Sequence, residues 1–356
     1  MNSRTVLTAA AVTLVLVSAA FAQQKPVKVL VLYDMEGVTG ATSYKHTSFA
    51  EKIEYEQGRK SLTADVNAAI AGLKAAGATE IVVVDGHGSG NSQSPDVLED
   101  QLLPPAKMIS RDRSFDIYMD SYDHSFDAIV AVAMHAGAGN TVGFCSHTYT
   151  LEDSQYRVNG IPYNESMILA MGAARYRIPL IMVSGDDQLE KELKRNLPWV
   201  KYAAVKHAVN RSTAEPFPRD EVSRRIESAA REALAGLDAA RLPEFPGPYR
   251  FALTFQDEAQ ARNAALLPGA EVLADPTTAQ IRANDFEEGY RQSLRLISLA
   301  GIVGRAAAFQ AVLGDQPNAD ALRLRTSEWL FERWLNLLPP APPAAPRTAQ
   351  RYWGAR

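Results

Sequence analysis

Short apolar runs alternate with longer amphipathic stretches from residue 27 to about residue 206. Three runs rich in β-branched residues have the length of buried strands: 29–32, 81–84 and 128–132. Between the first two runs, the stretch 61–76 places apolar residues at helical spacing, and Gly77 follows it as a common helix stop. Strands that alternate with helices in this way predict an α/β fold with a mostly parallel sheet and helices on both faces.

A smaller unit is expected after a Pro-rich linker at 243–248. The pattern there predicts three strands and a helix, which together indicate an α+β lobe: 249–255, 270–273, 277–283 and 284–300. Helical spacing continues to about residue 336, and Pro and Ala then dominate, as in disordered tails. The predicted organisation is a signal peptide at 1–22, an α/β catalytic domain at 23–240, a smaller α+β lobe at 248–301, a helical extension at 302–338 and a Pro-rich disordered tail at 339–356.

The N-terminus has the pattern of a secretory signal peptide. Arg4 gives a positive start, residues 6–17 are apolar, and Ala20-Phe21-Ala22 forms a small-x-small cleavage site. This pattern predicts a secreted or periplasmic protein, and we expect no other membrane span. The net charge of −4 and the scattered basic residues leave no footprint for nucleic acid or an anionic membrane, so we expect neither as a partner.

Side chains that can bind metal follow three of the predicted strands. Asp34 and Glu36 stand two positions apart at the end of the first strand, so the strand period points both to the same side. His87 follows the second strand and His135 follows the third. The carboxyl ends of parallel strands meet at one sheet edge, where α/β proteins bind their ligands. Carboxylate and imidazole together suit zinc or a similar transition ion better than calcium or magnesium.

Two further residues complete a candidate site. Glu165 heads a helix after a predicted hairpin at 149–165, and His147 lies just before that hairpin, twelve residues after His135. A dinuclear site needs about five or six protein ligands, one of them a bridging carboxylate. The chain supplies that number with Asp34, Glu36, His87, His135 and Glu165. His147 is left over, as expected for a residue that moves protons rather than holding metal.

Each candidate residue could instead have a purely structural role, without binding metal. Asp34 and Glu36 could be solvated acids at a strand end, and His87 could simply lie in a glycine loop. His135 follows an apolar run, where a single histidine is usually a satisfied core residue. Glu165 could be present because acids in the first turn of a helix are favoured by the helix dipole. The matching positions at successive strand ends favour the joint metal site.

These motifs resemble the DppA-type D-aminopeptidases, a family of zinc metallopeptidases, from about residue 28 to residue 301. The family motif Ser-x-Asp-x-Glu-Gly corresponds to residues 32–37, with Leu32 in place of the serine. Serine is not a metal ligand in the family, so this replacement leaves the ligand set intact. Further matches are 85–87, the segment around His135, 146–147, 159–165, 185–187, 203–206, 267–271 and 277–278.

The resemblance implies two zinc ions per subunit, bridged by Asp34. It divides the other ligands between the two ions as Glu36 with His135 and His87 with Glu165. It also implies His147 as the catalytic residue and a ring-shaped homodecamer that encloses the active sites. Residues 302–356 extend past the usual end of the family, and nothing in the sequence encodes a preference for D-residues.

The combined interpretation is an exported zinc aminopeptidase that releases N-terminal, D-configured amino acids from short peptides. The expected mechanism is attack by a metal-bound hydroxide, with His147 moving a proton rather than acting as a nucleophile. Two alternatives stay open at this point: a non-catalytic exported protein that binds metal or solute, and a dinuclear amidase or phosphoesterase on the same scaffold. The sequence does not define the stereospecificity, the exact peptide, the physiological metal or the number of subunits.

Overall fold

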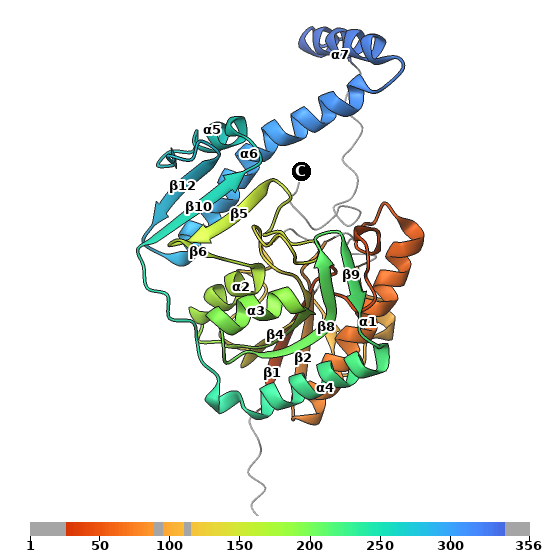
Figure 1. Ribbon diagram of the computed structural model, residues 1–356, viewed down its shortest axis with the longest axis vertical. Coiled ribbons are helices and arrows are strands. Elements are labelled where there is room, and N and C mark those ends of the chain that lie inside the picture. The colour runs from red at the N-terminus through yellow and green to blue at the C-terminus, as the bar shows by residue number, and fades with distance from the viewer. Residues whose placement is uncertain (1–25, 89–94, 110–114, 339–356) are drawn as a thin grey trace, which may run out of the picture.

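A seven-stranded sheet forms the centre of the larger part of the molecule in the computed structural model (Figure 1). Its order is β3-β2-β1-β4-β7-β8-β9, and neighbouring strands are parallel except for the pair β8–β9. The strands are Lys28–Tyr33 (β1), Glu80–Asp85 (β2), Lys107–Met108 (β3), Ala128–Met134 (β4), Leu180–Asp186 (β7), Lys201–Asn210 (β8) and Thr213–Pro216 (β9). The predicted α/β class with a mostly parallel sheet is confirmed.

The structure describes residues 26–88, 95–109 and 115–338. The predicted signal peptide at 1–22 and the predicted tail at 339–356 therefore lie outside the described residues.

Helices cover both faces of the central sheet, as the strand pattern predicts. One face carries α1 (Lys52–Ala75) and α4 (Arg219–Ala235), and the other carries α2 (Glu165–Ala174) and α3 (Asp187–Asn196). Val29 and Val31 of β1 belong to the core under α1 and α4, whereas Leu30 and Leu32 belong to the core beside α2 and α3. Three 3₁₀ turns complete this part: Tyr44–His46 (η1), Glu99–Gln101 (η2) and Leu237–Ala239 (η3).

Helix α1 begins at Lys52, earlier than the predicted start at residue 61. The first turns have few apolar residues, but Tyr55 is buried and Gly58 lies against η1. A Cβ atom at Gly58 would lie 2.1 Å from the carbonyl oxygen of His46, so only glycine allows this close approach. The early start thus depends on tertiary packing rather than on helical periodicity.

A second, antiparallel sheet of five strands forms the smaller lobe, in the order β11-β12-β10-β5-β6. Its strands are Asp153–Val158 (β5), Ile161–Pro162 (β6), Tyr249–Phe255 (β10), Glu271–Val272 (β11) and Thr278–Ala283 (β12). Helices α5 (Glu258–Ala264) and α6 (Phe286–Gly314) accompany it. The predicted hairpin turns at Asn159 and Gly160, both with positive φ, and its strands join this smaller sheet through β10.

The later part of α6, together with α7, extends away from both sheets (Figure 1). The first part of α6 is buried in the lobe, but from Ile302 onward most of its residues are exposed, as is nearly all of α7 (Ala319–Trp334). Among the described residues, α6 alone has the length and apolar composition of a membrane span, with 22% of its most apolar window buried. The sequence pattern predicts no stretch of this kind beyond the leader. The start of α6 packs against the smaller sheet, as the core helix of a globular domain does, so length and composition alone do not make α6 a membrane span.

Candidate metal centre

All six predicted site residues lie at the carboxyl edge of the central sheet. Asp34 and Glu36 follow β1, His87 follows β2 and His135 follows β4, and these three strands are neighbours in the order β2-β1-β4. Glu165 is the first residue of α2, and His147 lies in the connection that leads to β5. The structure therefore brings together residues that are up to 131 positions apart in the chain.

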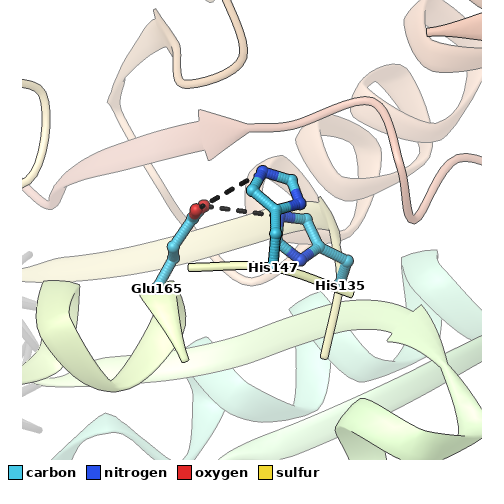
Figure 2. A group of neighbouring side chains, drawn as sticks. All are labelled: His135, His147 and Glu165. Atoms are coloured by element: carbon cyan, nitrogen blue, oxygen red, sulfur yellow. Dashed lines mark ion pairs between the residues drawn. The ribbon is translucent and has the colours of Figure 1, made fainter. Parts of the chain in front are cut away.

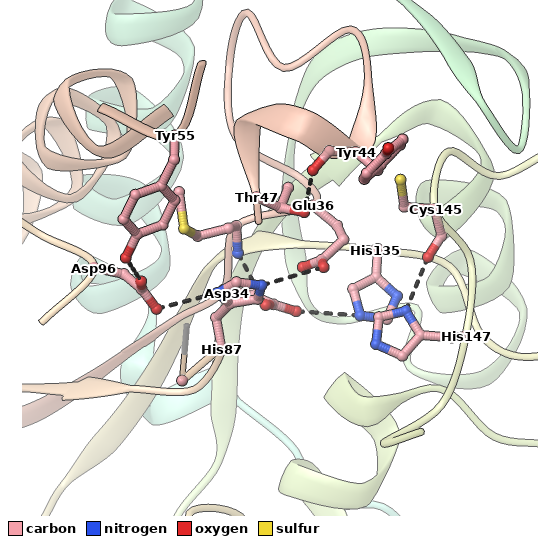
Figure 3. Close-up of polar contacts among 12 residues, drawn as sticks. Asp34, Glu36, Tyr44, Thr47, Tyr55, His87, Asp96, His135, Cys145 and His147 are labelled. Carbon is pink, nitrogen blue, oxygen red and sulfur yellow. Dashed lines mark hydrogen bonds and ion pairs between the residues drawn. The ribbon is translucent and has the colours of Figure 1, made fainter. Parts of the chain in front are cut away.

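The side chains form two adjoining clusters (Figures 2 and 3). In the first cluster, His87 Nε2 lies 3.4 Å from Glu36 Oε1, and Asp34 adjoins them. In the second, His135 Nε2 lies 3.5 Å from Glu165 Oε2, and His147 Nε2 lies 3.9 Å from Glu165 Oε1. Asp34 joins the two clusters because its Oδ2 also lies 3.2 Å from His135 Nε2.

The rings of His135 and His147 are stacked, with centroids 4.0 Å apart. Each ring is held by its Nδ1 atom, which donates to a backbone carbonyl: that of Ala136 for His135 (2.9 Å) and that of Cys145 for His147 (2.8 Å). In a neutral ring, a proton on Nδ1 leaves the lone pair on Nε2, so Nε2 is the atom of each ring that can act as a base or a metal ligand.

Glycine at position 37 lets the chain turn sharply after the two carboxylates. The Gly37 amide donates to the carbonyl oxygen of Ala133 at 2.8 Å. A Cβ atom there would lie 2.0 Å from the carbonyl oxygen of Met134, so no other residue fits without moving the backbone. This contact joins the end of β1 to the end of β4, where Asp34 Oδ2 lies 3.2 Å from His135 Nε2.

A buried lysine holds the loop that follows Glu36. Lys206 is fully buried, and its Nζ donates to three carbonyl oxygens of this loop: Glu36 (2.5 Å), Val38 (3.1 Å) and Ala41 (3.0 Å). Burial lowers the pKa of Lys206 to about 8, against the opposing effect of Asp186. The segment 203–206 carries the family resemblance, but its sequence gives no indication of this role.

Burial and neighbouring charges give the three carboxylates of the site very different pKa values. Burial, together with the charge of Glu36, raises the pKa of Asp34 to about 8. Burial alone would also raise the pKa values of the other two acids, but His87 holds that of Glu36 well below its usual range, and His135 lowers that of Glu165 to about 2. A divalent cation that binds to these carboxylates and histidines would therefore displace the protons that some of them carry.

The pKa of His147 moves in the opposite direction from those of its neighbours. Burial and the adjacent His135 lower the pKa of His147, whereas the pKa values of His87 and His135 lie well above their usual range. Burial works against that rise, but Glu36 raises the pKa of His87 and Glu165 raises that of His135. His147 is therefore neutral near pH 7 and able to accept a proton.

These residues fit a divalent transition metal. Three buried atoms that converge here make no hydrogen bond within the described residues: Asp34 Oδ2, Glu36 Oε2 and His135 Nε2. Buried polar atoms are normally paired, so a set of unpaired acceptors indicates a cation site. Oxygen and imidazole ligands suit zinc. The two clusters group Glu36 with His87 and Glu165 with His135. The resemblance implies a different division of ligands between two ions, and that division stays a prediction.

Three supporting contacts have no counterpart in the sequence patterns. The Tyr118 hydroxyl donates to Glu165 Oε2, and the Tyr149 amide donates to Glu165 Oε1 at 2.5 Å. Asp96 Oδ2 lies 3.0 Å from His87 Nδ1. Neither Tyr118 nor Asp96 stands at a strand end or at a motif spacing, so only the folded chain reveals them.

The parallel sheet and the histidine–carboxylate clusters at its edge define a metal-dependent α/β hydrolase. The chain belongs to the D-aminopeptidase family of peptidases, whose family model matches residues 27–294. It is 30% identical to the D-aminopeptidase of Bacillus subtilis (strain 168) over 273 residues, which cover 77% of this chain and 97% of that relative.

A solved structure shows the same fold. It is described as the Zn-dependent D-aminopeptidase DppA from Bacillus subtilis, a self-compartmentalizing protease. It matches with a TM-score of 0.70 and 29% identity, over 77% of this chain and 97% of the other. The expected family is thereby confirmed, and with it the expectation that the chain is a peptidase.

Proposed function

We propose that this protein is a zinc-dependent aminopeptidase that releases D-configured N-terminal residues from short peptides. The observation that carries the proposal is the convergence of five ligand side chains and a neutral histidine at one sheet edge. Family membership supports the D-aminopeptidase activity, and the donor set supports zinc. The solved relative is itself described as zinc-dependent.

Two zinc ions would be held by Asp34, Glu36, His87, His135 and Glu165, with Asp34 as the bridge. Its position between the two clusters supports this assignment. When bound, the ions would polarise the scissile carbonyl and lower the pKa of water to about 7.

His147 supplies the proton chemistry in this proposal. Its Nδ1 proton is engaged with the Cys145 carbonyl, so Nε2 is the atom that accepts and returns a proton. Tyr118 and the Tyr149 amide hold Glu165 in place between the two histidines. A neutral base beside a fixed carboxylate supports a proton-transfer role, and it needs no covalent intermediate on His147.

A hydrolysis assay tests the function directly. Matched D- and L-aminoacyl anilides and dipeptides are offered to the purified protein with zinc, with and without a chelator. We expect hydrolysis of the D-substrates that the chelator abolishes and added zinc restores. Faster cleavage of L-substrates would contradict the stereospecificity, and no cleavage of either series would contradict the peptidase assignment.

We also propose that the chain forms a closed homo-oligomer, with ten subunits as the expected number. The relative described as self-compartmentalizing supports closure, because such an assembly limits access to short peptides. Light scattering on the purified chain would show the mass of a decamer, and a monomer at micromolar concentration would contradict assembly.

Export is proposed from the leader at 1–22. The mature N-terminus is then expected at Gln23. N-terminal sequencing of protein recovered outside the cytoplasm tests this, and an uncleaved chain retained in the cytoplasm would contradict it.

A further inference from the structure

A chain of side-chain contacts leads from helix α1 to the metal centre (Figure 3). The Tyr55 hydroxyl donates to Asp96 Oδ1, and Asp96 Oδ2 lies 3.0 Å from His87 Nδ1. On the far side of the ring, His87 Nε2 lies 3.4 Å from Glu36 Oε1. Asp96 has no exposed surface, so this contact is not one that water readily replaces.

The chemistry of Asp96 determines which nitrogen of His87 carries the proton. An ionised carboxylate can only accept hydrogen bonds, so the ring must donate from Nδ1. That leaves the lone pair of His87 on Nε2, which faces the ligand cluster.

His87 differs in this respect from the other two histidines of the site. His135 and His147 donate from Nδ1 to backbone carbonyls, which no substitution removes. His87 depends on a side chain. The orientation of the His87 ring can therefore be altered by a substitution at Asp96, which leaves His87 itself unchanged.

Helix α1 holds the segment that carries Asp96. Arg59 donates from Nε to the carbonyl oxygen of Asp96 at 3.1 Å and from Nη2 to that of Pro95 at 2.9 Å. Together with Tyr55, one turn earlier in α1, Arg59 fixes both the backbone and the carboxylate of Asp96.

We infer that Asp96 is a positioning residue for the metal centre, and that Tyr55 holds its carboxylate against His87. Asp96 fixes the ring of His87 with Nε2 toward the ion and adds a negative charge behind it, and both effects strengthen the bond from imidazole to metal. This inference rests on the proposed metal centre and assigns Asp96 no contact with substrate.

The test is a set of zinc affinities measured by competition with a chromogenic chelator on the full chain. We expect Asp96→Asn to weaken zinc binding by about 10–100-fold, the usual worth of such an outer partner. Tyr55→Phe removes one donor to Asp96 and should weaken binding by a smaller factor. At saturating zinc, kcat should stay close to that of the parent chain, because Asp96 acts through metal binding.

Asp65→Asn provides the matched control. Asp65 is also fully buried on α1, and its carboxylate pairs with Arg219 and with Thr39 rather than with a metal ligand. Its loss should lower the melting temperature and leave zinc affinity unchanged. Equal loss of affinity in Asp65→Asn and Asp96→Asn would overturn the proposal, because both effects would then be general losses of stability.

A spectroscopic readout separates orientation from stability. NMR of isotope-labelled histidine, at a pH high enough for the ring to be neutral, shows which nitrogen of His87 carries the remaining proton, and we expect Nδ1 in the parent chain. In Asp96→Asn the new amide can either donate or accept, so the Nε2-protonated form of His87 should appear. If Asp96→Asn does not fold, unchanged zinc affinity in Tyr55→Phe overturns the proposal. A parent chain that binds zinc but cleaves no peptide would contradict the proposed function alone.

Discussion

At the residue scale, His135 and His147 have stacked rings, but their protonation differs. The pKa of His135 is raised by Glu165, whereas that of His147 is lowered by burial and by His135. We therefore expect His147→Ala to keep its metal while kcat falls by about 10²–10⁴-fold, the usual worth of general acid–base catalysis. His135→Ala should instead lose metal, and excess zinc should restore part of its activity. Elemental analysis beside kinetics distinguishes the two roles, and loss of metal in His147→Ala would make it a ligand.

Zinc binding should release protons near neutral pH. The pKa values of His87 and His135 are raised, and that of Asp34 lies at about 8, so below these values protons occupy atoms that a metal needs. Zinc affinity should therefore fall as the pH falls through the raised pKa values and level off above them. Calorimetry in buffers of different ionisation enthalpy measures the protons released. An affinity that does not change with pH would contradict this charge arrangement.

The convergence of the candidate ligands could be predicted from sequence, because each of them except Glu165 follows a recognisable strand and parallel strands share one edge. Asp96 and Tyr118 could not be predicted. Each touches its metal ligand across the fold: Tyr118 lies 47 positions from Glu165, and Asp96 follows His87 by nine positions without any periodic pattern. Their contribution depends on side-chain direction, which spacing alone does not determine.

At the scale of elements, the turn after β1 depends on Gly37. Gly37→Ala would bring Cβ against the carbonyls of Ala133 and Met134, where no side-chain rotation relieves the clash. We expect a loss of roughly 3 kcal/mol in the free energy of unfolding, at the upper end for overpacking, together with reduced zinc content. Gly236→Ala is the control, because the nearest atom to its Cβ is 3.3 Å away and its φ is −96°. Thermal unfolding compares the two, and equal stability would show that the turn tolerates a side chain.

The hairpin at 149–165 and the strand at 249–255 could both be predicted from the sequence, but their pairing could not. The turn is local, and Asn159-Gly160 identifies it. The pairing of β5 with β10 joins distant segments: the Ser154 hydroxyl donates to the carbonyl oxygen of Thr254, 100 positions away. Such pairing follows from the packing of the whole lobe.

At the scale of the whole molecule, the C-terminal helices carry exposed apolar side chains outside the region that matches the family model. Phe331 is 63% exposed and Trp334 is 75% exposed. We expect this surface to add contacts between copies, so the double substitution Phe331→Glu with Trp334→Glu should reduce the mass of the assembly in light scattering. Ser327→Glu on the same helix serves as control, and an unchanged mass in the double variant would exclude this role. Vesicle flotation tests the same surface against lipid.

The proposed zinc centre holds two ions bridged by Asp34, and the metal content of the protein tests this proposal. Elemental analysis of the purified, active chain should give about two zinc ions per subunit, as expected for a bridged two-metal site. Asp34→Ala should lose both ions together, because its carboxylate lies between the two clusters. One ion or none in a fully active enzyme would contradict the proposed two-metal centre, as would an Asp34→Ala chain that keeps both ions.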